Sequence, residues 1–174
     1  NLYIIVMKTT ILRYSVYSAI MICALFLTSW YLLEHLPRTT QEILGYASMI
    51  VSLSFVFFGI KYYRERENEG KISFKRGLTI GVLISLITAL VFGILDVIYV
   101  EVLNPEFMDN YYMESVQALE ETLSGEALKT QLALLESQKE VFANPLFTFG
   151  IMAVTVFVIG FIISLISAWI LQRK

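Results

Sequence analysis

Long apolar stretches separated by short polar segments dominate the hydrophobicity pattern of the chain. Four stretches are continuously apolar, and each is close to the roughly 20 residues that a helix needs to cross the hydrocarbon core of a bilayer. They cover residues 14–33, 43–62, 77–98 and 145–171. Because membrane-spanning strands alternate apolar and polar positions, this pattern favours helices over a β-barrel. We therefore predict an all-α integral membrane protein with four transmembrane helices.

The segment between the third and fourth apolar stretches, residues 101–144, is polar and has a different pattern. Apolar residues recur there at helical spacing on both sides of Ser124-Gly125, which we expect to separate two helices. Residues 101–140 contain nine acidic and two basic residues, a net charge of −7. We predict an extracytoplasmic helical hairpin. Its charge fits either a solvated acidic face over an apolar seam or a surface that binds cations or a basic partner.

Composition indicates that lipid surrounds much of the chain. Of the 174 residues, 57% are hydrophobic and 16% are charged, and the mean hydropathy is +0.69. A soluble domain has about a quarter charged residues. The four apolar stretches occupy about half of the chain, which leaves little length for a separate catalytic domain.

Basic residues are unevenly distributed between the loops. Ten of the thirteen lie before the first apolar stretch, between the second and third, or after the fourth. Basic residues mark cytoplasmic loops, so we predict a bacterial inner-membrane protein with both termini in the cytoplasm. Orientation and attraction to anionic lipid account for the basic loop after the second stretch. Docking of a protein there is the alternative, whereas the interleaved glutamates argue against nucleic-acid binding.

Small residues recur at every fourth position in two of the predicted spans. The third span has Gly77, Gly81, Ser85, Ala89 and Gly93, and the fourth has Gly160, Ser164 and Ala168. Residues four apart lie on nearly the same helix face, and a ridge of small residues lets two helix backbones approach closely. These ridges predict either packing of the third span on the fourth or contact with a second copy or a partner helix.

Three polar residues near the predicted outer surface form a candidate ion or ligand site. Asp96 lies about one helical turn from the outer end of the third span. It fits either a hydrated interfacial carboxylate or a residue of an ion pathway, because ionisable residues within membranes are commonly functional. His35 follows Glu34 at the end of the first span, and this pair reads as interfacial or as a weak metal site.

The sequence carries no recognisable catalytic motif. It lacks a phosphate-binding glycine loop, paired cysteines, a His-Glu-x-x-His zinc motif and a Gly-x-Ser-x-Gly elbow. We therefore expect a protein that is not an enzyme and that uses no cofactor or metal. Met7 reads as a natural start, so residues 1–6 are left out of the fold prediction.

Three segments of the chain resemble one known family. They are Met7-Lys8-Thr9, the stretch 70–77 that enters the glycine-rich third span, and the acidic helices before Asn144-Pro145. From Met7 onward the chain resembles the family catalogued as domain of unknown function 4199, small inner-membrane proteins found mainly in Bacteroidota. The resemblance implies four transmembrane helices and no assigned activity, so it transfers no functional residues. It also implies a frequent association in gene order with membrane glycosyltransferases.

These observations lead to two main functional hypotheses. The first is a non-enzymatic accessory or assembly subunit of a membrane complex that contacts membrane lipids, a second copy or a partner membrane protein, and no nucleic acid. A membrane glycosyltransferase would be one such partner. The second is a small transporter or lipid-handling protein in which Asp96, His35 and the carboxylates of the outer segment line an entry. A sensor that binds a metal or ligand on its outer face is a third, weaker hypothesis.

Overall fold

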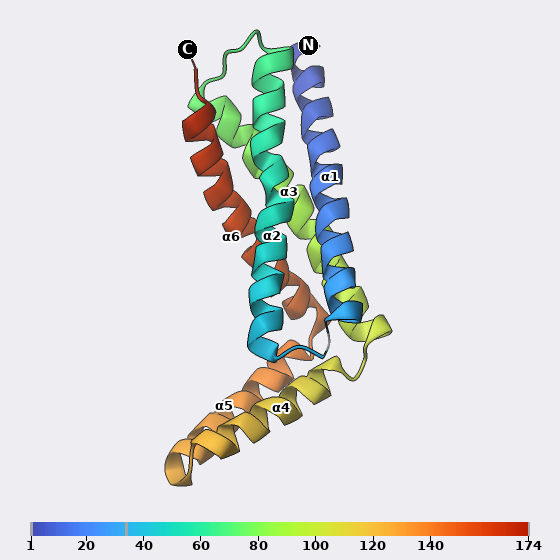
Figure 1. Cartoon of the computed structure of the whole chain (residues 1–174), viewed down its shortest axis with the longest axis vertical. Helices are drawn as coiled ribbons and strands as arrows, with labels where there is room; N and C mark the ends of the chain where they lie inside the picture. The colour runs from blue at the N-terminus through green and yellow to red at the C-terminus, as the bar shows by residue number, and fades with distance from the viewer. Residues whose placement is uncertain (1, 34, 174) are drawn as a thin grey trace. The chain divides into compact units, whose positions relative to one another are not determined.

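The structure is a computed structural model that describes residues 2–33 and 35–173. Its elements are α1 (Leu2–Leu32), α2 (Arg38–Tyr62), η1 (Tyr63–Glu67), α3 (Phe74–Ile98), η2 (Tyr99–Leu103), α4 (Phe107–Thr122), α5 (Gly125–Phe142) and α6 (Pro145–Leu171) (Figure 1). The segments η1 and η2 are single π-helical turns that extend α2 and α3. The prediction of an all-helical chain is thus confirmed for the described residues.

Four helices of the described chain are long and apolar enough to cross a membrane. These candidate spans are Ile5–Leu32, Thr39–Glu67, Phe74–Leu103 and Pro145–Leu171. The first three are longer than the apolar stretches predicted, and α1 already begins at Leu2, among the residues left out of the prediction. Hydropathy marks only the apolar part of a helix, whereas backbone hydrogen bonding continues through polar residues at its ends.

The chain divides into two compact units, which are described separately. The bundle unit comprises residues 1–92 and 153–174, and the α4–α5 unit comprises residues 93–152. Gly125, at the start of α5, has a φ of 63°, a left-handed conformation that favours glycine. This backbone geometry explains why the polar segment forms two helices with a break at Ser124-Gly125.

In the bundle unit, α1 runs beside α2, and α3 crosses behind α2 (Figure 1). The crossing is close at Gly59 of α2, where an added methyl group would lie 2.7 Å from Ile84 of α3 and 3.1 Å from Tyr14 of α1. Further along α3, the rings of Phe92 and Phe26 are 4.4 Å apart. The start of α1, the α2–α3 connection and the end of α6 lie at the same end of this unit (Figure 1).

The interior of the bundle unit combines apolar residues such as Ile22, Leu53 and Ile84 with small polar ones, and its outer surface is largely apolar. Its fully buried polar residues are Ser15, Ser18, Ser52, Ser85, Thr88 and Ser164. Several of these hydroxyls donate to a backbone carbonyl, as from Ser18 to Ser52 at 2.8 Å. By contrast, Ile20, Ile162 and Trp169 are at least half exposed. Water would not solvate such a surface well, so the apolar helices indicate a membrane protein.

Candidate functional site

The small-residue ridges of α3 and α6 face each other at close range. A methyl group at Gly160 would lie 2.6 Å from the Cβ of Ser85, and one at Gly81 would lie 2.8 Å from the Cβ of Ser164. Separations this short between non-bonded carbon atoms are strongly repulsive. Only glycine therefore fits at these two positions without a shift of the helices.

The other ridge residues follow the same antiparallel register. Gly77 faces Ala168, whose Cβ would be 3.3 Å from an added methyl group, and the hydroxyls of Ser85 and Ser164 are hydrogen-bonded at 3.2 Å. Ala89 is buried. Gly93, in the α4–α5 unit, faces the ring of Phe149, which would lie 2.9 Å from a methyl group added at this glycine. Of the two uses that the sequence left open for the ridges, the structure has the internal one.

A buried arginine ties the α2–α3 connection to the end of α6. Arg64 is 7% exposed and donates from Nη1 to the carbonyl oxygen of Leu171 at 3.2 Å and from Nη2 to Oε1 of Glu65 at 2.7 Å. An antiparallel bridge joins Ile72 to Arg173 through two backbone hydrogen bonds of 2.8 and 2.9 Å. The last carbonyl groups of a helix lack donors within the helix, and the guanidinium of Arg64 donates to one of them. Its positive charge also interacts favourably with the negative end of the α6 dipole.

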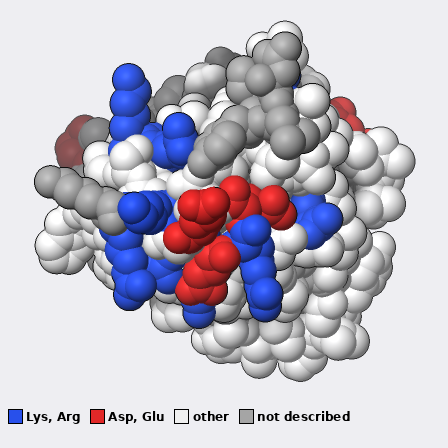
Figure 2. All heavy atoms as spheres, turned by 90° about the horizontal axis from the view of Figure 1, so that it is seen from above, with Lys and Arg blue, Asp and Glu red and all other residues white. Residues whose placement is uncertain are grey.

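The charges around this arginine are mixed rather than purely basic. Acidic side chains lie in the middle of this end of the bundle unit, with basic side chains around them (Figure 2). The exposed charged residues are Lys61, Glu65, Arg66, Glu67, Glu69, Lys71, Lys75 and Arg76. The described part of this surface therefore carries charges of both signs side by side.

Asp96 is in the protein interior. It is 5% exposed, and its Oδ2 atom has no hydrogen-bond partner among the described residues. The interfacial interpretation required a carboxylate at the surface, and the buried position of Asp96 does not fit it. Position along the helix indicated depth in the membrane, but burial depends on neighbouring segments that the sequence does not place. A buried carboxylate oxygen without a hydrogen-bond partner is unfavourable, and ionisable residues within membrane spans are commonly functional.

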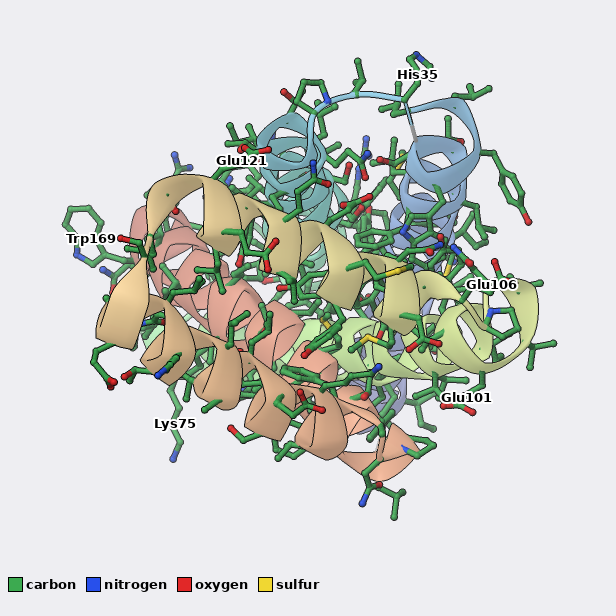
Figure 3. The ribbon with its side chains drawn as sticks, turned by 90° about the horizontal axis from the view of Figure 1, so that it is seen from below. His35, Lys75, Glu101, Glu106, Glu121 and Trp169 are labelled. Atoms are coloured by element: carbon green, nitrogen blue, oxygen red, sulfur yellow. The ribbon has the colours of Figure 1, made fainter. Side chains whose placement is uncertain are left out.

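The other two members of the predicted polar site are His35 and Glu34. His35 is exposed in the turn between α1 and α2, with its side chain pointing outward (Figure 3). Glu34 lies outside the described residues. Over the part of the chain that the structure describes, no group of three or more histidine, cysteine or acidic residues could hold a metal ion.

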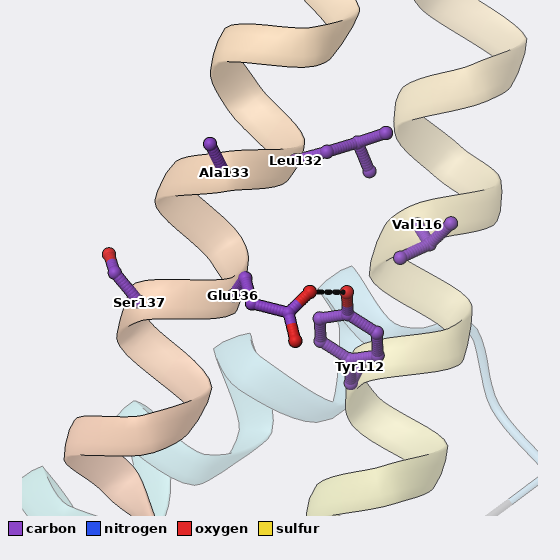
Figure 4. A pocket seen from close by; sticks show the side chains of 6 residues that line it. All are labelled: Tyr112, Val116, Leu132, Ala133, Glu136 and Ser137. Carbon is purple, nitrogen blue, oxygen red and sulfur yellow. Dashed lines mark hydrogen bonds between the residues drawn. The ribbon is translucent and has the colours of Figure 1, made fainter.

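The α4–α5 pair is held by polar contacts that the sequence analysis missed. Tyr112 donates from its hydroxyl to Oε2 of Glu136 at 2.8 Å (Figure 4). Lys139 pairs with Asp109 at 2.9 Å. The Lys139 ammonium also lies 4.7 Å from the centre of the Tyr112 ring. The hydrogen bond to Glu136 raises the pKa of Tyr112, and the hydrogen bond to Asp109 raises the pKa of Lys139. The spacing of these residues could have indicated the contacts, because Asp109 and Tyr112 are three positions apart on α4, as are Glu136 and Lys139 on α5.

A shallow groove runs beside these contacts between α4 and α5. Its volume is about 580 Å³, and its lining residues are Tyr112, Val116, Leu132, Ala133, Glu136 and Ser137 (Figure 4). None of the α4 residues is buried. Glu101, Glu106 and Glu121 are exposed on the same unit, whose acidic side chains spread outward (Figure 3). The pair thus has an apolar seam that stays open to its surroundings.

Comparison with known proteins identified a family but no characterised relative. A search of curated proteins and a search of solved structures gave no match. A family model described as a protein of unknown function (DUF4199) matches residues 13–173, which is most of the chain. The matched region includes all four candidate membrane spans in whole or in large part. The chain therefore belongs to the DUF4199 family.

Proposed function

We propose that this protein is a non-enzymatic accessory or assembly subunit of a complex in the bacterial inner membrane. The observation that carries the proposal is the incomplete packing of the α4–α5 pair. Amphipathic helices gain most of their stability by covering their apolar faces. Here two helices share one seam, no residue of α4 is buried, and a groove remains between them. A third helix would complete this layer.

The chemistry of the groove indicates the kind of helix that fits it. Val116, Leu132 and Ala133 supply an apolar floor, and Glu136 supplies a carboxylate at its edge. Residues 101–140 have a net charge of −7. An amphipathic helix with basic residues beside its apolar face would match both features, as in other helix-in-groove complexes. We therefore propose such a helix, from another membrane protein, as the partner.

The bundle unit would serve as the membrane anchor of this docking surface. Its small-residue ridges are occupied by the contact between α3 and α6, so they do not offer a surface for a partner. The basic residues at the end with the α2–α3 connection favour a cytoplasmic location for that end and for both termini. With four crossings, the α4–α5 pair would then lie outside the cytoplasm. The family resemblance makes a membrane glycosyltransferase one partner to test.

Site-specific photocrosslinking tests the proposed docking surface. A photoreactive amino acid at Ala133 in the groove should crosslink, in native membranes, to one membrane protein through a basic amphipathic helix. The matched control carries the same amino acid at Glu120 of α4, which is exposed and does not line the groove. Equal crosslinking at both positions, or a crosslinked segment that is neither helical nor basic, would contradict the proposal.

Transport or lipid handling is a second candidate function, favoured by Asp96. Its buried carboxylate has an unpaired oxygen, which a transported cation or a polar ligand could satisfy. This function predicts that Asp96→Asn abolishes flux in reconstituted vesicles while the protein still folds. Unchanged flux, or no flux in either protein, would exclude this role for Asp96.

A further inference from the structure

A second groove lies within the bundle unit, between α1 and α3. Its lining residues are Lys8, Ile11, Leu12, Leu83 and Ile87, and its volume is about 310 Å³. The groove follows from the path of α3, whose first turns lie on the side of α6 and away from α1 (Figure 1). Later in the helix, Phe92 reaches Phe26 of α1, with ring centres 4.4 Å apart. The two helices therefore diverge toward the end of the unit where α1 begins.

The lining of this groove is entirely aliphatic, because Lys8 contributes only the apolar stem of its side chain to it. Lys8 precedes Ile11 and Leu12 by three and four residues, so all three share one face of α1. Leu12 is 61% exposed and Leu83 is 37% exposed, so the groove opens to the outside of the bundle unit. Both helices are candidate membrane spans. The material outside the groove is therefore hydrocarbon, and an acyl chain matches its floor.

Lys8 is available for a ligand at the end of this groove. It is exposed and makes no hydrogen bond or ion pair with any residue that the structure describes. Long basic side chains extend along apolar surface and place their charge at the headgroup level. The groove thus has a hydrocarbon-compatible floor below and positive charge above.

We propose that the α1–α3 groove binds an anionic phospholipid, with one acyl chain between Ile11 and Leu83 and the phosphate paired with Lys8. The positive charge selects for an anionic headgroup because a zwitterionic lipid offers it no net attraction. This site is in the bundle unit and uses no residue of the α4–α5 groove. Its existence is therefore independent of the docking function proposed above.

Lipid retention by the full-length protein tests the site. The detergent-purified protein is saturated with phosphatidylglycerol or with phosphatidylcholine of the same acyl chains, and bound lipid is counted by native mass spectrometry during dilution. We expect one phosphatidylglycerol to be retained preferentially. Lys8→Gln should weaken its retention about fivefold and leave phosphatidylcholine unchanged, and Lys8→Arg should restore it. The matched control is Lys61→Gln, an exposed lysine that does not line the groove.

A second variant separates the acyl-chain site from a general attraction to basic residues. Leu83→Trp should fill the groove and displace phosphatidylglycerol even though Lys8 is intact. The melting temperature of each variant in detergent shows that the bundle is still folded, and a variant that unfolds is replaced by Ile87→Phe. Equal loss for Lys8→Gln and Lys61→Gln, or equal retention of both lipids by the wild-type protein, would overturn the proposal.

Discussion

The helices of the bundle unit and those of the α4–α5 unit pack together by different kinds of contact. In the bundle unit, α3 and α6 approach until Gly81 and Gly160 leave no room for a methyl group. In the α4–α5 unit, no residue of α4 is buried, and the two helices meet through exposed polar contacts such as Tyr112 with Glu136. The helix backbones of α3 and α6 are thus in close contact, whereas the α4–α5 pair retains an open apolar seam.

This difference follows from the solvent that each unit is suited to. Hydrocarbon gives no hydrophobic drive for two apolar helices to associate, so shape and small polar groups must hold them together. Water gives such a drive, and an amphipathic pair that leaves part of its seam open retains a tendency to bind something more. This difference supports the proposal that the bundle unit is the membrane anchor and that the α4–α5 pair binds a partner.

The largest expected effect comes from filling the α3–α6 contact. Replacing Gly81 and Ser85 together with leucine should lower the free energy of unfolding by more than about 3 kcal/mol, because each side chain must displace a helix. Unfolding in mixed micelles, followed by circular dichroism, measures the change. Gly150→Ala in α6 is the control, since nothing lies within 4 Å of a methyl group there. Equal stability of both proteins would show that the ridges do not hold the bundle.

Removing the buried arginine should give the next largest effect. Arg64→Ala removes the charged donor to Leu171 and should cost about 2 kcal/mol of stability. Hydrogen exchange at the amide of Arg173 should accelerate as well, because its bridge to Ile72 loses support. Arg66→Ala, at an exposed position of the same turn, should change neither quantity. If Arg66→Ala has the larger effect, the role assigned to Arg64 is wrong.

Replacing Asp96 should stabilise the fold, in contrast to the two changes above. A buried carboxylate oxygen without a partner destabilises the fold, so Asp96→Leu should raise the free energy of unfolding by about 1 kcal/mol. The same micelle titration measures this gain. A loss of stability instead would mean that a ligand or partner pairs with Asp96, which would favour the transport function.

The smallest expected effect is a pH dependence confined to the α4–α5 pair. The pKa values of Tyr112 and Lys139 are both raised from their ordinary values of 10.0 and 10.5. A raised pKa in the folded state means that the contribution to stability is complete below the unfolded pKa and is lost as pH rises through the folded one. Helix contacts in the pair should therefore weaken above about pH 10.

Absorbance of ionised tyrosine provides the measurement. The difference between titrations of the wild-type protein and Tyr112→Phe isolates this residue, and its midpoint should lie above 10.0. Glu136→Gln removes the acceptor charge and should shift the midpoint back toward the ordinary value. A midpoint at or below 10.0 in the wild-type protein would show that the hydrogen bond to Glu136 does not form.

The sequence predicted those features that depend on one helix at a time. Continuous hydropathy identified four long helices, and the four-residue period selected Gly81 and Gly160, which lie in the α3–α6 contact. The sequence did not predict that Arg64 is buried and donates to the carbonyl of Leu171, because the two residues are more than a hundred positions apart in the chain. The pairing of Tyr112 with Glu136 was missed for the same reason, since it depends on the register between two helices.

Cysteine labelling tests the central claim, that four helices cross the membrane and place the α2–α3 connection and the α4–α5 pair on opposite sides. In a Cys23→Ala background, Lys71→Cys and Ser124→Cys are exposed to a membrane-impermeant maleimide in spheroplasts. We expect Ser124→Cys to be labelled at once and Lys71→Cys to be labelled only after the membrane is permeabilised. Labelling of both residues from the same side, or release of the protein from membranes without detergent, would contradict it.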